Sequence, residues 1–112
     1  MTHPNKVKGN IAERAVVTYL RDRGFIHAER SRSGWTDDRG DIDGLPGVCI
    51  EVKNEKRINL AGYMAELERE TLAAHADTGV CVVKRRGTSD VAEWYAVMPM
   101  SMWVTLMKEN ER

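Results

Sequence analysis

The feature that most constrains the fold is an alternation of polar and apolar residues on both sides of Pro46-Gly47. The alternation covers Asp41 to Leu45 and Val48 to Asn54, and each stretch is long enough for a β-strand. A proline–glycine pair between two such stretches favours a turn. The sequence therefore predicts a β-hairpin over residues 41–54.

The other segments predict a mixture of helices and strands. Apolar residues recur three and four apart over residues 6–23, from the capping residue Asn59 to about residue 76, and over residues 100–110. Gly24 and Gly79 are expected to mark the ends of the first two helices. Strand-like composition is found in Phe25–Ser31, Val80–Lys84 and Val91–Val97, and residues 32–40 are typical of a loop. We therefore expect one α/β domain over residues 1–112, in the order α-β-β-β-α-β-β-α.

Composition limits the classes of protein that the chain can belong to. The 17 basic and 17 acidic residues cancel, but residues 1–33 carry a net charge of +4 and residues 34–112 a net charge of −4. A nucleic acid would therefore meet the N-terminal third. No stretch approaches the ~20 apolar residues needed to span a bilayer, so we expect a soluble, intracellular protein. Cys49 and Cys81 lie among apolar β-branched residues, which favours burial over a disulfide.

The predicted hairpin also carries a candidate active site, formed by Asp41 and by Glu51-Val52-Lys53. Strand alternation places Glu51 and Lys53 on one face. Asp41 joins them only if the loop has an odd length or a bulge, and a two-residue loop would place it on the other face. Closely spaced carboxylates suit Mg²⁺ or Mn²⁺, and a metal with a neighbouring lysine can cleave a phosphodiester. The alternative is that these residues form only the solvated face of a hairpin.

Glu13 is a further candidate because it lies within the apolar stripe of the first predicted helix. Burial of a carboxylate is costly unless it meets a metal, a cation or good hydrogen-bond donors. Glu13 can therefore belong to a metal site. The alternatives are a first turn that exposes it to water, or a pairing with Arg30 or Lys53.

Four segments, in this order, resemble the PD-(D/E)XK nuclease superfamily, in particular the archaeal Holliday-junction resolvases and their phage relatives. The segments are Lys8-Gly9-Asn10-Ile11-Ala12-Glu13-Arg14, Arg30-Ser31-Arg32-Ser33-Gly34, Gly40-Asp41-Ile42-Asp43 and Glu51-Val52-Lys53. The resemblance covers about residues 6–85. It implies a restriction-endonuclease-like mixed central sheet flanked by helices, and a Mg²⁺-dependent endonuclease that leaves a 5′-phosphate, with Mn²⁺ as a substitute. It further implies a cytoplasmic protein of a prokaryote or of a phage host.

The resemblance also implies roles for individual residues. Asp41, Glu51 and the Val52 carbonyl would hold the metal, Glu13 would complete the site, and Lys53 would assist the attacking water. The family pattern usually has proline at the position of Gly40, and archaeal resolvases are usually basic, whereas this chain is neutral. A four-way junction is the expected substrate, and the alternatives are single-stranded, flap or duplex DNA, or a DNA-binding module without catalysis.

DNA and a second copy of the chain are the expected partners. Arginines that flank Glu13 on the first helix can hold phosphates, and the resemblance places the serines beside the scissile phosphate. The Met-rich segment at the C-terminus offers a surface for a homodimer. The predicted DNA-binding residues are Lys8, Arg14, Arg21, Arg30, Ser31, Arg32 and Ser33.

Overall fold

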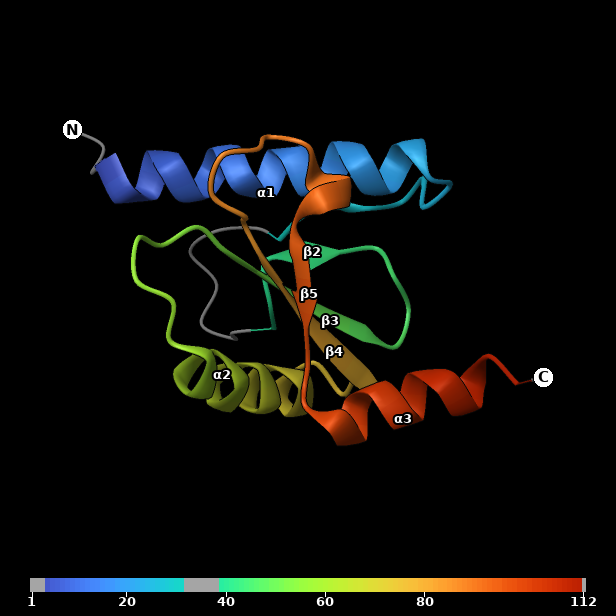
Figure 1. Ribbon diagram of the computed structural model, residues 1–112. Helices are drawn as coiled ribbons and strands as arrows, with labels where there is room; N and C mark the ends of the chain where they lie inside the picture. Colours follow the sequence, from blue (N-terminus) through green and yellow to red (C-terminus); the bar gives the residue numbers. More distant parts are fainter. Residues whose placement is uncertain (1–3, 32–38, 112) are drawn as a thin grey trace.

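A computed structural model describes residues 4–31 and 39–111, and it contains a five-stranded sheet between helices (Figure 1). The strand order is β1-β2-β3-β4-β5, and only β3 and β4 run parallel to each other. The α/β class with a mixed sheet is therefore confirmed. The elements are α1 (Pro4–Asp22), β1 (Glu29–Arg30), β2 (Ile42–Asp43), β3 (Val48–Lys53), α2 (Leu60–Ala73), β4 (Thr78–Val83), the 3₁₀ helix η1 (Val91–Glu93), β5 (Tyr95–Val97) and α3 (Met100–Glu109).

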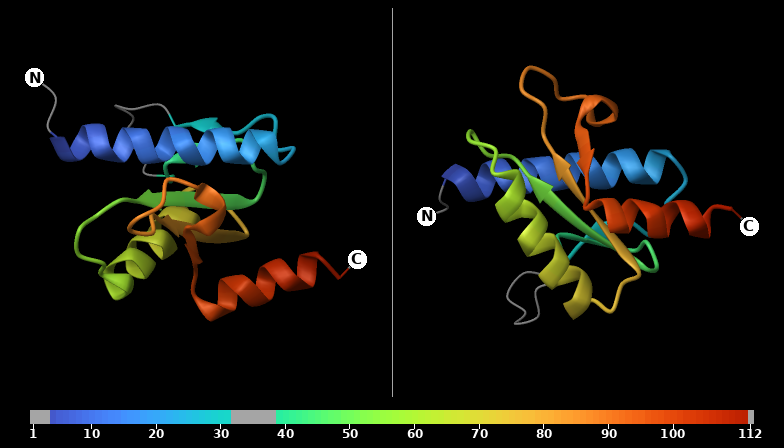
Figure 2. Two further views of the ribbon diagram at one scale, coloured as in Figure 1. Left: turned by 45° about the horizontal axis from the view of Figure 1, so that its top comes forward. Right: turned by 60° about the horizontal axis from the view of Figure 1, so that its bottom comes forward.

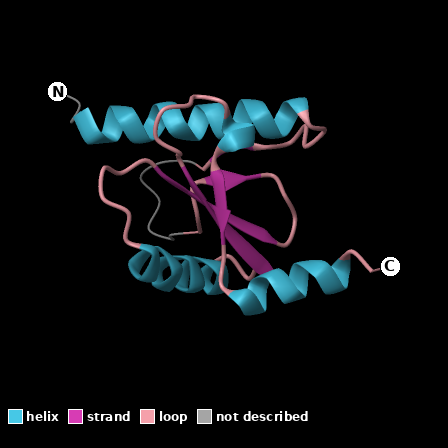
Figure 3. Cartoon of the chain, in the orientation of Figure 1, coloured by secondary structure: helices cyan, strands magenta, loops and turns pink. Residues whose placement is uncertain are grey.

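The helices cover opposite faces of the sheet, with α1 on one side and α2 and α3 on the other (Figures 1 and 2). Figure 3 shows the strands as a separate layer between them. Alternate residues of β3 divide between the two layers, because Ile50 and Val52 pack in the core under α1 while Cys49 packs in the core under α2. Glu51 and Lys53 follow the alternation of Cys49 and thus belong to the α2 face.

The pairing of β2 with β3 decides the face on which Asp41 lies. Ile42 is opposite Ile50, and the Asp41 backbone N–H donates to the Ile50 carbonyl at 2.7 Å. Seven residues, 43–49, lie between this pair, and such an odd number is what a position of Asp41 beside Glu51 and Lys53 requires. Gly47 has a φ of +78° in this loop, a conformation that glycine adopts without strain. The structure thus brings Asp41 to the same pocket as Glu51 and Lys53.

Three predicted strands are shorter than expected, and of Asp41–Leu45 only Ile42–Asp43 is a strand. Of Phe25–Ser31, only Glu29–Arg30 is a strand, because the Ala28 N–H donates to the Phe25 carbonyl at 3.0 Å and closes a local turn. Of Val91–Val97, only the last three residues form β5. The preceding residues form η1, in which the Asp90 side chain accepts a hydrogen bond from the Ala92 N–H at 3.1 Å.

The prediction that Gly79 ends the second helix is wrong. The helix ends at Ala73, and Gly79 lies inside β4. A side chain at Gly79 would place its Cβ 2.5 Å from Thr71 Oγ1 and 3.0 Å from a methyl carbon of Leu67. Glycine is therefore required there because α2 packs closely on β4, and its role is tertiary contact.

The predicted cap at Asn59 and the predicted burial of both cysteines are confirmed. The Asn59 side chain caps α2 by accepting a hydrogen bond from the Gly62 N–H at 3.0 Å. Cys49 and Cys81 are buried and form no disulfide. None of the helices in the described part of the chain has the length and apolar character that crossing a membrane requires.

We expect Leu67→Ala to reduce the free energy of unfolding by about 2–5 kcal/mol, because it leaves a cavity between α2 and the sheet. Leu67 is 0% exposed, whereas Leu72 on the same helix is 77% exposed. Leu72→Ala is the matched control and should change stability by less than about 0.5 kcal/mol. Urea denaturation measures both values, and equal effects of the two substitutions would contradict the packing described here.

Candidate active site

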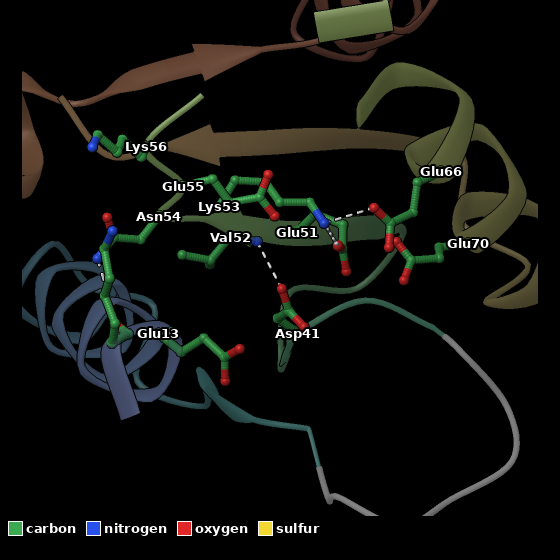
Figure 4. Close-up of a pocket in the computed structure, with 12 residues that line it drawn as sticks. Glu13, Asp41, Glu51, Val52, Lys53, Asn54, Glu55, Lys56, Glu66 and Glu70 are labelled. Carbon is green, nitrogen blue, oxygen red and sulfur yellow. Dashed lines mark hydrogen bonds and ion pairs between the residues drawn. The ribbon is translucent and has the colours of Figure 1, made fainter. Parts of the chain in front are cut away.

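A pocket of about 560 Å³ lies at the end of β3 between α1 and α2, and Figure 4 shows the residues that line it. All the residues predicted for catalysis or metal binding line this one pocket: Glu13, Asp41, Glu51, Val52 and Lys53. Glu66 and Glu70 of α2, which the sequence analysis did not identify, also line it. The fold thus brings together residues from α1, the hairpin and α2.

Asp41 is held at the point where β2 begins. Its Oδ2 accepts a hydrogen bond from the Val52 backbone N–H at 2.8 Å. The N–H and the C=O of a strand residue point to the same side, so the Val52 carbonyl faces the same side of β3 as Asp41. Asp41 and the Val52 carbonyl therefore lie on the same side of β3.

Glu51 is the least solvated acid of the predicted set. The residue is 3% exposed, and its Oε1 has no hydrogen-bond partner among the described residues. Burial, followed by the negative charge of Asp41, raises the pKa of Glu51 to about 8, although a hydrogen bond with Glu70 and the charge of Lys53 act in the opposite direction. A cation in the pocket would stabilise the ionised form of this carboxyl group.

Lys53 lies over the acids of the α2 face. Its Nζ is 2.6 Å from Glu66 Oε1 and 3.7 Å from Glu51 Oε2, and it lies 5.4 Å from the centre of the Tyr63 ring. Burial alone would lower the pKa of Lys53, but the hydrogen bond to Glu66 and the charge of Glu51 outweigh burial and raise it above its ordinary value. Lys53 is therefore a cation at neutral pH and a counter-ion for these carboxylates.

Glu13 extends from α1 toward the pocket, and its side chain is 19% exposed (Figure 4). Its Oε1 is 3.0 Å from Arg30 Nε, and the Arg30 Nη2 donates to Asn10 Oδ1 at 2.7 Å. The pairing with Arg30, one of the alternatives raised by the sequence, is thus present in the structure. The role of Glu13 at a metal stays a prediction.

Glu66 and Glu70 occupy adjacent turns of α2 on the side that faces Glu51 (Figure 4). One ligand oxygen from each of Glu51, Glu66 and Glu70 lies within 4.8 Å of the others, and no other group of three acidic, histidine or cysteine side chains in the described part of the chain is as close. The sequence contained a signal for Glu70. It lies three residues after Leu67 and four before Ala74, within the apolar stripe, in the same way that Glu13 does.

The predicted DNA-binding residues in the described part of the chain differ in their contacts. Lys8 lines the pocket and Arg14 is exposed on α1, whereas Arg21 Nε donates to the Ala28 carbonyl at 2.7 Å. Ser31 Oγ donates to Asp43 Oδ1 at 3.0 Å. Arg32 and Ser33 lie outside the described residues. Arg30 is engaged by Glu13, as described above.

The residues of the pocket fit a hard divalent cation. The available donors are carboxylate oxygens and a backbone carbonyl, which are the ligands that Mg²⁺ and Mn²⁺ prefer. The buried Glu51 Oε1, which lacks a hydrogen bond from any described residue, is an oxygen that such a cation would satisfy. Asp41, Glu51 and the Val52 carbonyl could hold it, with Glu66 or Glu70 on the side of α2.

We expect Glu51→Gln to stabilise the metal-free protein at about pH 9 but not at about pH 5. The pKa of Glu51 is raised from 4.5 to about 8, so its contribution to stability is complete below about 4.5 and is lost as the pH rises through about 8. Glutamine cannot ionise and avoids this loss. Thermal denaturation in a chelator should show a melting temperature higher than that of the wild type by on the order of 5 °C at the higher pH. A difference that does not change with pH would contradict the burial of an ionisable Glu51.

No protein-family model matches the chain, and the searches of curated proteins and of solved structures found no similar protein. The resemblance to the PD-(D/E)XK nucleases therefore stays a prediction from the sequence. The function proposed below depends on the residues of the pocket and on their chemistry.

Proposed function

We propose that the protein is a divalent-metal-dependent DNA endonuclease with a restriction-endonuclease-like fold, which hydrolyses phosphodiester bonds with Mg²⁺. The observation that carries this proposal is that Asp41, Glu51 and Lys53, all supplied by one hairpin, line one pocket. The solvated hairpin face, which was the simpler alternative, fits poorly because Glu51 is buried.

Each residue has a role that follows from its position. Asp41, fixed by the Val52 N–H, and the buried Glu51 hold the cation. When bound, the cation polarises the phosphodiester and lowers the pKa of a water molecule. Lys53 donates hydrogen bonds to the attacking water or to the negative charge that develops on the phosphate oxygens. Glu13, at the α1 side of the pocket, would accept a hydrogen bond from water there.

The charge distribution of the pocket supports a phosphate-containing substrate. Lys8 and Lys56 line the pocket together with the acids, and both lysines are exposed. Exposed lysines attract the DNA backbone, while the buried acids repel phosphate unless a cation lies between them. This arrangement suits a polyanion that binds together with a metal ion.

Branched DNA is the substrate class that we propose, with a four-way junction as its most specific form. Paired cuts in a symmetric junction require two active sites related by a two-fold axis, so the active unit would be a homodimer. The exposed apolar residues of α3, which include Met100, Trp103 and Met107, are available for such contact.

We expect Asp41→Asn to abolish cleavage while leaving DNA binding intact or stronger, because it removes a charge that binds metal and repels phosphate. Asp43→Asn is the matched control. Asp43 is exposed on the same strand, and asparagine keeps the acceptor for the Ser31 hydroxyl.

Lys53→Ala should slow hydrolysis by on the order of 10²-fold, because one hydrogen-bond donor to the transition state is lost.

Cleavage is measured on a matched set of four-way junction, flap, single-stranded and duplex DNA with Mg²⁺ or Mn²⁺. Full activity of Asp41→Asn would remove the proposed active site. Preference for a substrate other than the junction would keep the nuclease and change its substrate class. Specific DNA binding without cleavage on any of the substrates would favour the non-catalytic module.

A further inference from the structure

The acids of the pocket extend beyond those that the hairpin supplies. Glu66 and Glu70 are separated by one turn of α2 and meet Glu51 across the gap between the helix and β3 (Figure 4). The three ligand oxygens lie within 4.8 Å of one another. Ionised carboxylates at such distances repel each other strongly unless a positive charge lies among them.

A second observation, the environment of Glu51 Oε1, supports a cation as the ligand of this cluster. Glu51 is buried, and its Oε1 has no hydrogen-bond donor among the described residues even though it faces the pocket. An acceptor buried in this way costs free energy unless a ligand satisfies it. An exposed group of acids would carry no such cost.

Lys53 supplies one positive charge to this cluster. Its Nζ is closer to Glu66, at 2.6 Å, than to Glu51, at 3.7 Å, so the ammonium lies among the oxygens that a metal ion would contact. Three carboxylates meet in this cluster, those of Glu51, Glu66 and Glu70, and the structure places the Lys53 ammonium at ion-pair distance from two of them. A divalent ion would compensate more of that charge.

We propose that Glu66 and Glu70 of α2 form a divalent-cation site with Glu51, and that the Lys53 ammonium occupies this site as an internal counter-ion until the cation binds. The incoming cation takes the carboxylate oxygens of Glu51 and Glu66, and Lys53 moves away from Glu66. The released ammonium is then available to a phosphate at the pocket opening. The inference rests on the proposed function, because the cation bound in this pocket would be the one that the nuclease needs.

The test is direct Mn²⁺ binding to the full chain without DNA, measured by electron paramagnetic resonance of free Mn²⁺. Glu66→Gln should weaken Mn²⁺ affinity by at least about ten-fold, since a ligand is lost. Glu68→Gln, an exposed change on the same helix, is the matched control and should bind as the wild type does. Lys53→Ala should bind Mn²⁺ several-fold more tightly, because the competing ammonium is gone.

The choice of variants keeps the test independent of folding. The Glu66 side chain is 29% exposed, so glutamine there leaves the core intact, and circular dichroism checks the fold of each variant. If Glu66→Gln binds Mn²⁺ as tightly as the wild type does, the assignment of α2 residues as metal ligands is wrong. Unchanged or weaker binding by Lys53→Ala would overturn the role of Lys53 as a counter-ion.

The outcomes for metal binding and for cleavage separate the two proposals. A wild-type protein that binds Mn²⁺ through Glu66 but cuts no DNA supports the metal site and overturns the nuclease. If the wild type cuts DNA and Glu66→Gln binds Mn²⁺ with unchanged affinity, the metal site proposed here is wrong and the nuclease proposal stands. If the wild type neither binds Mn²⁺ nor cuts DNA, both proposals are wrong.

Discussion

The burial of the Glu51 carboxyl group among other acids is the constraint on which the rest of the site depends. A carboxylate taken out of water beside Asp41 is unfavourable, and both effects raise the pKa of Glu51 to about 8. The protein offsets part of it with the Lys53 ammonium. What remains is a local excess of negative charge that a divalent cation would compensate, which connects the stability of the metal-free protein with its proposed activity.

The architecture of the sheet makes this burial possible. On β3, Ile50 and Val52 pack under α1, and this leaves Glu51 and Lys53 on the face that α2 covers. The close approach of α2 depends on Gly79 of β4, where a side chain would collide with Thr71. That approach brings Glu66 and Glu70 to the acids of the hairpin. Packing of the core and assembly of the pocket are thus parts of the same arrangement.

Local patterns in the sequence predicted much of the fold and part of the site. Strand alternation was sufficient to place Glu51 and Lys53 on one face, and the cap at Asn59 was correctly identified. The face of Asp41 depended on the loop register, which Pro46-Gly47 does not fix. Helix spacing places Glu70 in the apolar stripe of α2, but the proximity of Glu66 and Glu70 to Glu51 depends on how α2 packs on the sheet, so both were missed. The strand predicted from Phe25 begins only at Glu29, because local turn hydrogen bonds replace ladder pairing in the residues before it.

The central claim is that the acids around Glu51 are a cation site, and anomalous X-ray scattering from crystals grown with Mn²⁺ tests it most directly. We expect a manganese peak in the pocket, coordinated by Glu51 and by at least one further carboxylate of Asp41, Glu66 or Glu70, with the Lys53 ammonium moved away from Glu66. Crystals saturated with Mn²⁺ that show no peak in this pocket, with Lys53 still paired to Glu66, would contradict it.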